Sequence, residues 1–186
     1  MRDSREAILQ AATALLAEGG FAEASLRNVA TRAGCTTGSV THHFADRQEL
    51  LMATLERAHQ AAAARMLEKV SASLKPKAQL RAVIHEALPL DRKRMIEWRV
   101  WLAFWNEAAA NPAVAREHSK RYREWRAALD ALLRPLVASP SSRAHHVDSL
   151  VALIDGLGLG LIVASKPAIQ KARALDAVER MLSTLR

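Results

Sequence analysis

The sequence predicts an all-α protein with about nine helices. The chain is rich in alanine, leucine, arginine and glutamate, is sparse in valine and isoleucine, and holds only seven glycines and six prolines in 186 residues. Its long patterned stretches repeat at 3.6 residues per turn, without the sustained alternation that indicates strands. Half of the residues are hydrophobic, which is enough to build the core of one or two domains.

The first helix is predicted at about residues 4–18. Asp3 followed by Glu6 resembles a capping box, which satisfies the free backbone N–H groups at the start of a helix. Apolar residues then recur at helical spacing as far as Gly19 and Gly20. Paired glycines favour the end of a helix at that point.

Two short helices joined by a glycine turn follow the first helix. Ser25 is a candidate N-cap for a helix that runs through Arg32, and Gly34 suits the left-handed position after it. Thr36 is a candidate N-cap for the next helix, which ends at about Phe44. This arrangement predicts a helix-turn-helix motif.

A long helix is predicted from Arg47 to about Ser73. Asp46 and Glu49 form a second capping box at its start. At 1.5 Å per residue this helix is a rod of roughly 40 Å, long enough to link two regions of the protein.

Prolines separate the remaining helical patterns. Five further helices are expected, at residues 77–88, 91–110, 113–136, 142–165 and 168–185. We therefore expect a helix-turn-helix domain at residues 1–50 and a larger helical domain at residues 51–186.

The net charge of +8 suggests a polyanionic partner but does not locate its site. Residues 1–50 hold five arginines and six acidic residues, a net charge of −1, so the rest of the chain carries +9. No apolar run reaches the roughly 20 residues that span a bilayer. Cys35 is the single cysteine, which suits a reducing compartment. We therefore expect a cytoplasmic protein with no membrane partner.

Metal-site and catalytic patterns are absent from the sequence, and we predict no metal, no cofactor and no enzymatic activity. The paired histidines His42–His43 and His145–His146 point about 100° apart on a helix and cannot share one metal ion. The chain contains one E-x-x-H pattern, whereas a di-iron bundle requires two. Hydrolase and phosphate-loop motifs are missing, so an all-α enzyme is the weaker alternative, beside a plain helical adaptor.

The helix expected after Thr36 has an apolar and a polar side. Val29, Ala30, Ala33, Val40 and Phe44 form the inward face of the two short helices, and the hydroxyl, imidazole and guanidinium groups point outward. Such groups hydrogen-bond phosphate oxygens and base edges, and the DNA major groove admits one α-helix. The pattern therefore favours DNA binding, although threonine and serine residues can also serve only as helix caps.

The segment SLRNVATRAGCTTGSVTHHFADRQELL, residues 25–51, resembles the DNA-binding segment of TetR-family transcriptional regulators. Thr37 stands where lysine is frequent in that family, and Thr41 where tyrosine is frequent. The resemblance implies a DNA-binding role for Ser25, Arg27, Thr36, Thr37, Gly38, Ser39, Thr41, His42, His43 and Arg47.

Three of the four tryptophans fall on one face of a predicted helix. Trp98, Trp101 and Trp105 occur at positions i, i+3 and i+7, and Tyr122 and Trp125 add aromatic rings on the next helix. These five side chains form either a core between helices or a pocket that holds an organic cation by cation–π attraction. In the second case Asp91, Glu97 or Glu107 is available to balance the charge of the ligand.

The segments ALPLD at 87–91 and EWRVWLAFW at 97–105 resemble the effector domain of the betaine repressor subgroup, whose namesake responds to choline. This resemblance implies a small-molecule effector, with an organic cation as one candidate.

Residues 145–165 present a broad apolar face whose exposure on a monomer would promote aggregation. Together with the helix at 168–185 it is expected to form a four-helix dimer interface, as the family generally does, or else an intrachain core. The expected interface residues are Leu150, Leu153, Leu157, Leu161, Val178 and Met181.

The sequence therefore predicts a ligand-responsive transcriptional repressor. We expect a homodimer that binds a palindromic operator in double-stranded DNA and is released by a small-molecule effector. When bound to DNA it would be associated with the nucleoid.

Overall fold

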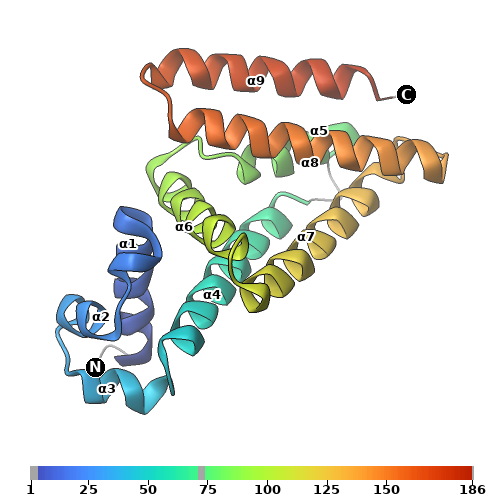
Figure 1. Ribbon diagram of the computed structural model, residues 1–186. Helices are drawn as coiled ribbons and strands as arrows, with labels where there is room; N and C mark the ends of the chain where they lie inside the picture. The colour runs from blue at the N-terminus through green and yellow to red at the C-terminus, as the bar shows by residue number, and fades with distance from the viewer. Residues whose placement is uncertain (1–3, 71–73, 186) are drawn as a thin grey trace. The chain divides into compact units, whose positions relative to one another are not determined.

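The computed structural model describes residues 4–70 and 74–185, and within these ranges the chain forms nine α-helices and no strand (Figure 1). The predicted all-α class is therefore confirmed. The chain divides into two compact units: unit 1 holds the residues up to Ala61 together with Ile96–His118, and unit 2 holds Ala62–Met95 and the residues from Ser119 onward. These units do not follow chain order, and the predicted domain boundary at residue 50 stays a prediction.

Unit 1 contains the predicted helix-turn-helix. It holds three complete helices and parts of three others: α1 (Ser4–Glu23), α2 (Leu26–Ala33), α3 (Thr37–His43), the first part of α4 (Arg47–Glu68), most of α6 (Arg92–Ala108) and the start of α7 (Pro112–Leu133). Helix α2 packs against both α1 and α3.

The regular part of α1 ends at two glycines, as predicted. Gly19 and Gly20 have non-helical backbone angles, and Gly20 has a φ of 67° and a ψ of −157°. Because this conformation is rare for residues that carry a Cβ atom, glycine is required at position 20 for the chain to turn toward α2.

The helix caps that the sequence predicts around α2 and α3 are present. The Ser25 hydroxyl accepts a hydrogen bond from the Asn28 backbone N–H at 3.1 Å, and Thr36 does the same for Ser39 at 3.1 Å. Gly34 ends α2 in the left-handed conformation, with a φ of 70°. These contacts fix where α2 ends and α3 begins.

The core of unit 1 is shared by the helix-turn-helix and α6. Val29, Val40 and Phe44 lie in one apolar cluster with Val100 and Phe104 of α6, and each is at most 1% exposed. Residues far apart in sequence therefore hold the short helices in place, because helices as short as α2 and α3 are marginal by themselves.

Unit 2 contains α5 (Pro76–Ala87), α8 (Pro140–Ile162), α9 (Pro167–Ser183), most of α7 and the adjoining ends of α4 and α6. Helices α8 and α9 lie side by side, and α5 also packs on α9 (Figure 1). The Arg81 guanidinium donates to both carboxylate oxygens of Glu179 at 2.6 and 2.8 Å, which joins α5 to α9.

The predicted boundaries of the later helices agree with the structure within a few residues, and four helices begin at a proline. Helix α4 is shorter than predicted, with 22 residues and therefore a length of about 33 Å. It ends because Lys69 and Val70 bond to carbonyl groups three residues earlier, in a turn. The predicted end at Ser73 lies outside the described residues.

Helix α8 is long and apolar enough, by length and composition alone, to span a membrane, which the sequence prediction did not anticipate. A helix that packs in a protein core passes the same test. One side of α8 does pack inside unit 2, where Leu150, Ile154 and Leu161 are at most 5% exposed.

The turn at Gly34 yields a stability prediction. Gly34→Ala is expected to lower the free energy of unfolding by about 1 to 2 kcal/mol, because a Cβ atom is disfavoured at its left-handed φ. Urea unfolding followed by circular dichroism measures this change. In the matched variant Gly38→Ala the φ is not positive and the new Cβ would lie 3.6 Å from the Thr36 hydroxyl oxygen, so stability should hold or rise. Equal losses of unfolding free energy in the two variants would contradict the view that the left-handed φ of Gly34 is what requires glycine there.

Candidate nucleic-acid interface

Helix α3 presents its polar residues to solvent and its apolar residues to the core. Thr37, Gly38, Thr41 and His42 are exposed, whereas Val40 is fully buried. Burial of one side of so short a helix fixes which side remains free. The residues predicted to touch DNA on this helix therefore form an outward polar surface.

Two side chains on this surface keep their hydrogen-bonding groups unused within the chain. Among the described residues, neither the Thr37 hydroxyl nor the ring nitrogens of His42 make a hydrogen bond, although the His42 ring contacts that of His43. The Thr41 hydroxyl donates to the Gly38 carbonyl at 3.2 Å, and the His43 Nε2 atom lies 2.5 Å from the Ser4 hydroxyl oxygen. Thr37 and His42 are thus the most available donors and acceptors on α3.

The three arginines of the helix-turn-helix segment have different surroundings. Arg32 forms an ion pair with both carboxylate oxygens of Glu18, and this contact lowers the pKa of the Glu18 carboxyl. Arg27 is exposed, and its guanidinium has no hydrogen bond or ion pair among the described residues. Arg27 is therefore the arginine of this segment that is free to bind an external anion.

Arg47 is held by the backbone of its own subunit. Its Nε donates to the Ala24 carbonyl at 3.0 Å, its Nη2 donates to the Phe21 carbonyl, and its guanidinium lies 5.8 Å from the centre of the Phe21 ring. Ala24 directly precedes the N-cap of α2. The side chain thus ties the start of α4 to the entry of α2, and its predicted contact with DNA stays a prediction.

The three tryptophans of α6 belong to unit 1. The ring centres of Trp98 and Trp105 lie 5.9 Å apart in an edge-to-face arrangement. Trp101 contacts the ring of His59, and Trp105 also contacts that of His118, with 6.2 Å between ring centres in each pair. Trp98 is only 8% exposed, so this ring serves in large part as core.

Tyr122 and Trp125 belong to unit 2, so the five predicted pocket residues are divided between the two units. A pocket lined by these five residues stays a prediction. The Tyr122 hydroxyl donates to the Asp155 Oδ2 atom at 2.7 Å. Of the carboxylates suggested from sequence, Asp91 is already bonded to the backbone and side chain of Arg94 at 2.9 Å.

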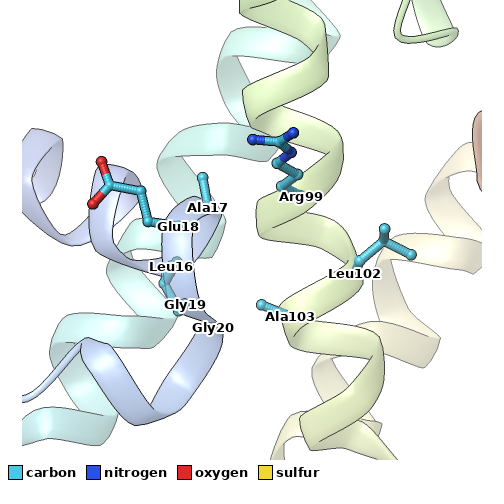
Figure 2. A pocket seen from close by; sticks show the side chains of 8 residues that line it. All are labelled: Leu16, Ala17, Glu18, Gly19, Gly20, Arg99, Leu102 and Ala103. Carbon is cyan, nitrogen blue, oxygen red and sulfur yellow. The ribbon is translucent and has the colours of Figure 1, made fainter. Parts of the chain in front are cut away.

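An open hollow in unit 1 lies between the end of α1 and one side of α6 (Figure 2). It is lined by Leu16, Ala17, Glu18, Gly19, Gly20, Arg99, Leu102 and Ala103. None of the predicted pocket residues lines it. No group of three histidine, cysteine or acidic side chains suited to a metal occurs among residues 4–70 and 74–185.

The predicted interface residues of α8 and α9 differ in exposure. Leu150, Leu161 and Val178 are buried within the chain, each at most 5% exposed. Leu153, Leu157 and Met181 are partly exposed. A separate row of small and apolar residues faces solvent: Ala152, Gly156 and Leu159 on α8, and Val163 directly after its end.

Known proteins match both parts of the chain. Residues 8–54 match the model of bacterial regulatory proteins of the tetR family, and residues 76–186 match that of the BetI-type transcriptional repressor C-terminal domain. The chain belongs to the tetR family. The HTH-type transcriptional regulator BetI of Paraburkholderia phymatum is 32% identical over 189 residues, which cover 98% of this chain and 95% of that protein. The family and these relatives are transcriptional regulators and not enzymes.

Solved structures of similar proteins share the fold of this tetR-family protein. A transcriptional regulator from Rhodococcus sp. Rha1 superimposes with a TM-score of 0.85 at 30% identity, over 98% of each chain. A regulator from Saccharomonospora viridis, solved in complex with choline, has a TM-score of 0.84 at 22% identity and covers 96% of this chain and 97% of its own.

The structure of this tetR-family regulator adds one residue that the sequence analysis did not consider. Asp155 accepts a hydrogen bond from Tyr122 although the two lie 33 positions apart in the sequence. A single aspartate in a helix rich in glycine and leucine does not by itself predict a functional site. Its hydrogen-bond partner depends on how α7 and α8 pack against each other, which the sequence does not show.

The contacts of Arg47 separate a structural role from a DNA-binding role. Arg47→Ala is expected to lower the free energy of unfolding by about 1 to 3 kcal/mol, because two backbone carbonyls lose a charged donor. Thermal and urea unfolding measure this effect. Arg27→Ala is the control and should leave stability unchanged. If the Arg47→Ala variant is as stable as wild type and only its DNA affinity falls, the principal role of Arg47 is contact with DNA.

Proposed function

We propose that this tetR-family regulator represses transcription as a homodimer that binds a palindromic operator. Each subunit would insert α3 into the major groove of one half-site, and the two-fold symmetry of the operator would mirror that of the protein. The observation that carries this proposal is the outward polar surface of α3, with Thr37 and His42 free and Val40 buried beneath them.

Arg27 is the proposed cationic contact beside α3. A guanidinium group pairs with phosphate oxygens or with two acceptors on guanine, and both uses require a side chain that is not already paired. Arg27 meets this condition, whereas Arg32 is neutralised by Glu18. Ser25 is half-buried and Thr36 is exposed, and the hydroxyl of each already accepts a hydrogen bond from a backbone N–H group. Each would therefore support DNA binding by fixing the position of its helix.

Dimerisation is proposed through α8 and α9. The solvent-facing residues Ala152, Gly156 and Leu159 recur at positions i, i+4 and i+7, which is one stripe along α8, and Val163 follows as the C-cap of this helix. Leu159 is 45% and Val163 71% exposed, a large apolar exposure for two neighbouring positions. Small side chains at 152 and 156 would let a second helix approach closely.

The proposed effector is a small organic cation that releases the protein from DNA. The choline complex of the Saccharomonospora viridis regulator and the BetI-type family match support this class of ligand. A ligand weakens DNA binding only if it binds better to the form with low DNA affinity. Helix α4 contributes residues to both units. We propose that a tilt of this helix transmits ligand binding to the DNA-binding helices. A regulator of this kind would work in the cytoplasm, at the nucleoid.

Removal of Arg27 tests the DNA-binding proposal. Arg27→Ala is expected to weaken binding to the DNA upstream of the protein's own gene by about 1 to 3 kcal/mol, or roughly tenfold for each 1.4 kcal/mol. A mobility shift titration at fixed salt measures the affinity. Arg123→Ala, which removes an exposed charge from α7 in unit 2, is the charge-matched control and should bind nearly as well as wild type. Equal affinity of wild type and Arg27→Ala would refute the role of Arg27.

A charged residue at position 156 tests the dimer interface. Among the described residues, no atom outside the local helix backbone lies within 4 Å of a Cβ atom built on Gly156, so Gly156→Glu is compatible with the fold of one subunit. If α8 forms the interface, the variant should be monomeric in analytical ultracentrifugation and should lose operator binding. Ala131→Glu adds the same charge to an exposed position of α7 and should remain dimeric. A dimeric Gly156→Glu protein would exclude this part of α8 from the interface.

A further inference from the structure

Three polar bridges join α7 to α8. Arg126 forms an ion pair with Asp148, and Arg143 donates to Asp130 at 3.1 Å. At the third bridge the Tyr122 hydroxyl donates to the Asp155 Oδ2 atom at 2.7 Å. Two of the three carboxylates therefore face an arginine, whereas Asp155 faces a neutral phenol.

Asp155 has no positively charged partner in the described part of the chain. Its carboxylate forms no ion pair, and its single hydrogen bond is the one from Tyr122, which occupies one of its two oxygens. The residue is half-buried, in contrast to Asp148, which is exposed and paired. The Oδ1 atom of Asp155 is left to interact with another group.

Burial of a carboxylate without a cation is unfavourable, because the group loses water and gains no opposite charge. Burial raises the pKa of Asp155, and the hydrogen bond from Tyr122 only partly offsets this effect. Burial and the neighbouring Asp155 also raise the pKa of Tyr122, so its hydroxyl remains a protonated donor. A bound cation would offset the cost of burying the Asp155 carboxylate.

Other half-buried carboxylates of unit 2 already have their cations. Glu86 pairs with Arg65 at 2.8 Å and with Arg94 at 3.3 Å. Asp130 pairs with Arg143 and Arg134, which lower the pKa of its carboxyl. Among the half-buried carboxylates of unit 2 that the structure describes, Asp155 is therefore the one that would gain most from an additional positive charge.

We propose that Asp155 and Tyr122 form the cation-binding subsite of the effector and that they hold the ammonium group of a small organic cation. This inference rests on the proposed function, since it specifies which residues recognise the charge of the effector. The carboxylate would supply the opposite charge, and the Tyr122 ring would offer an aromatic face to the methyl groups of the cation. A Mg²⁺ or Ca²⁺ ion fits poorly here, because each takes six or more oxygen ligands.

Calorimetric titration of the full-length protein tests the subsite. The probes are choline, tetramethylammonium and 3,3-dimethyl-1-butanol, the last being a neutral analogue of choline with the same shape. Wild type is expected to bind the two cations more tightly than the neutral alcohol. Asp155→Asn keeps the size of the side chain and its acceptor for Tyr122, and should weaken choline binding at least tenfold, or about 1.4 kcal/mol. It should leave binding of the neutral alcohol unchanged.

Two further variants separate the subsite from a general effect of charge or structure. Asp148→Asn removes a carboxylate from the same helix and should bind choline like wild type. Tyr122→Phe keeps the ring and removes the hydrogen bond, so choline binding should weaken less than in Asp155→Asn. Without ligand, Asp155→Asn should unfold at a temperature equal to or above that of wild type, because it no longer buries an unpaired charge.

The proposal is overturned if Asp155→Asn binds choline as tightly as wild type, or if wild type binds neither cation. A mobility shift without ligand keeps this result separate from the DNA-binding proposal, because wild type and Asp155→Asn should bind DNA equally. If wild type bound choline through Asp155 but bound no DNA, the subsite would stand and the proposed repressor function would fail.

Discussion

The candidate DNA-binding surface depends on the burial of Val40 and Phe44. Helix α3 has only seven residues, and a helix of this length is unstable by itself in water. Val40 and Phe44 are at most 1% exposed, in a core that α1, α4 and α6 also build. Because these two side chains fix the rotation of the helix, Thr37 and His42 must face away from the core. The polar surface is therefore a consequence of where the apolar residues are.

Local sequence signals predicted the fold well because each depends on residues close together in the chain. The caps at Ser25 and Thr36, the left-handed Gly34 and the prolines that begin helices are all encoded within a few positions. The end of α4 was placed too far along, because no proline or glycine marks it before the turn at Lys69 and Val70.

Contacts between distant residues could not be predicted in the same way. The sequence does not show that Arg32 is neutralised by Glu18, that Arg47 binds the carbonyls of Phe21 and Ala24, or that Arg27 remains free. These differences are decided by how α1, α2 and α4 pack, and they change which arginine is the best candidate for contact with DNA. The same limit applies to Asp155, whose partner is set by the pairing of α7 with α8.

Helix α6 falls within the BetI-type family match and also contributes to the core of unit 1. Its residues Val100 and Phe104 lie in that core. The Phe104 ring meets that of Phe21 edge to face at 4.9 Å, and Phe21 in turn contacts Arg47. Since closely packed cores resist small displacements, α6 cannot shift without repacking the residues that hold α2 and α3. Any displacement of α6 would therefore reach α2 and α3 through the packing of Phe104 within unit 1.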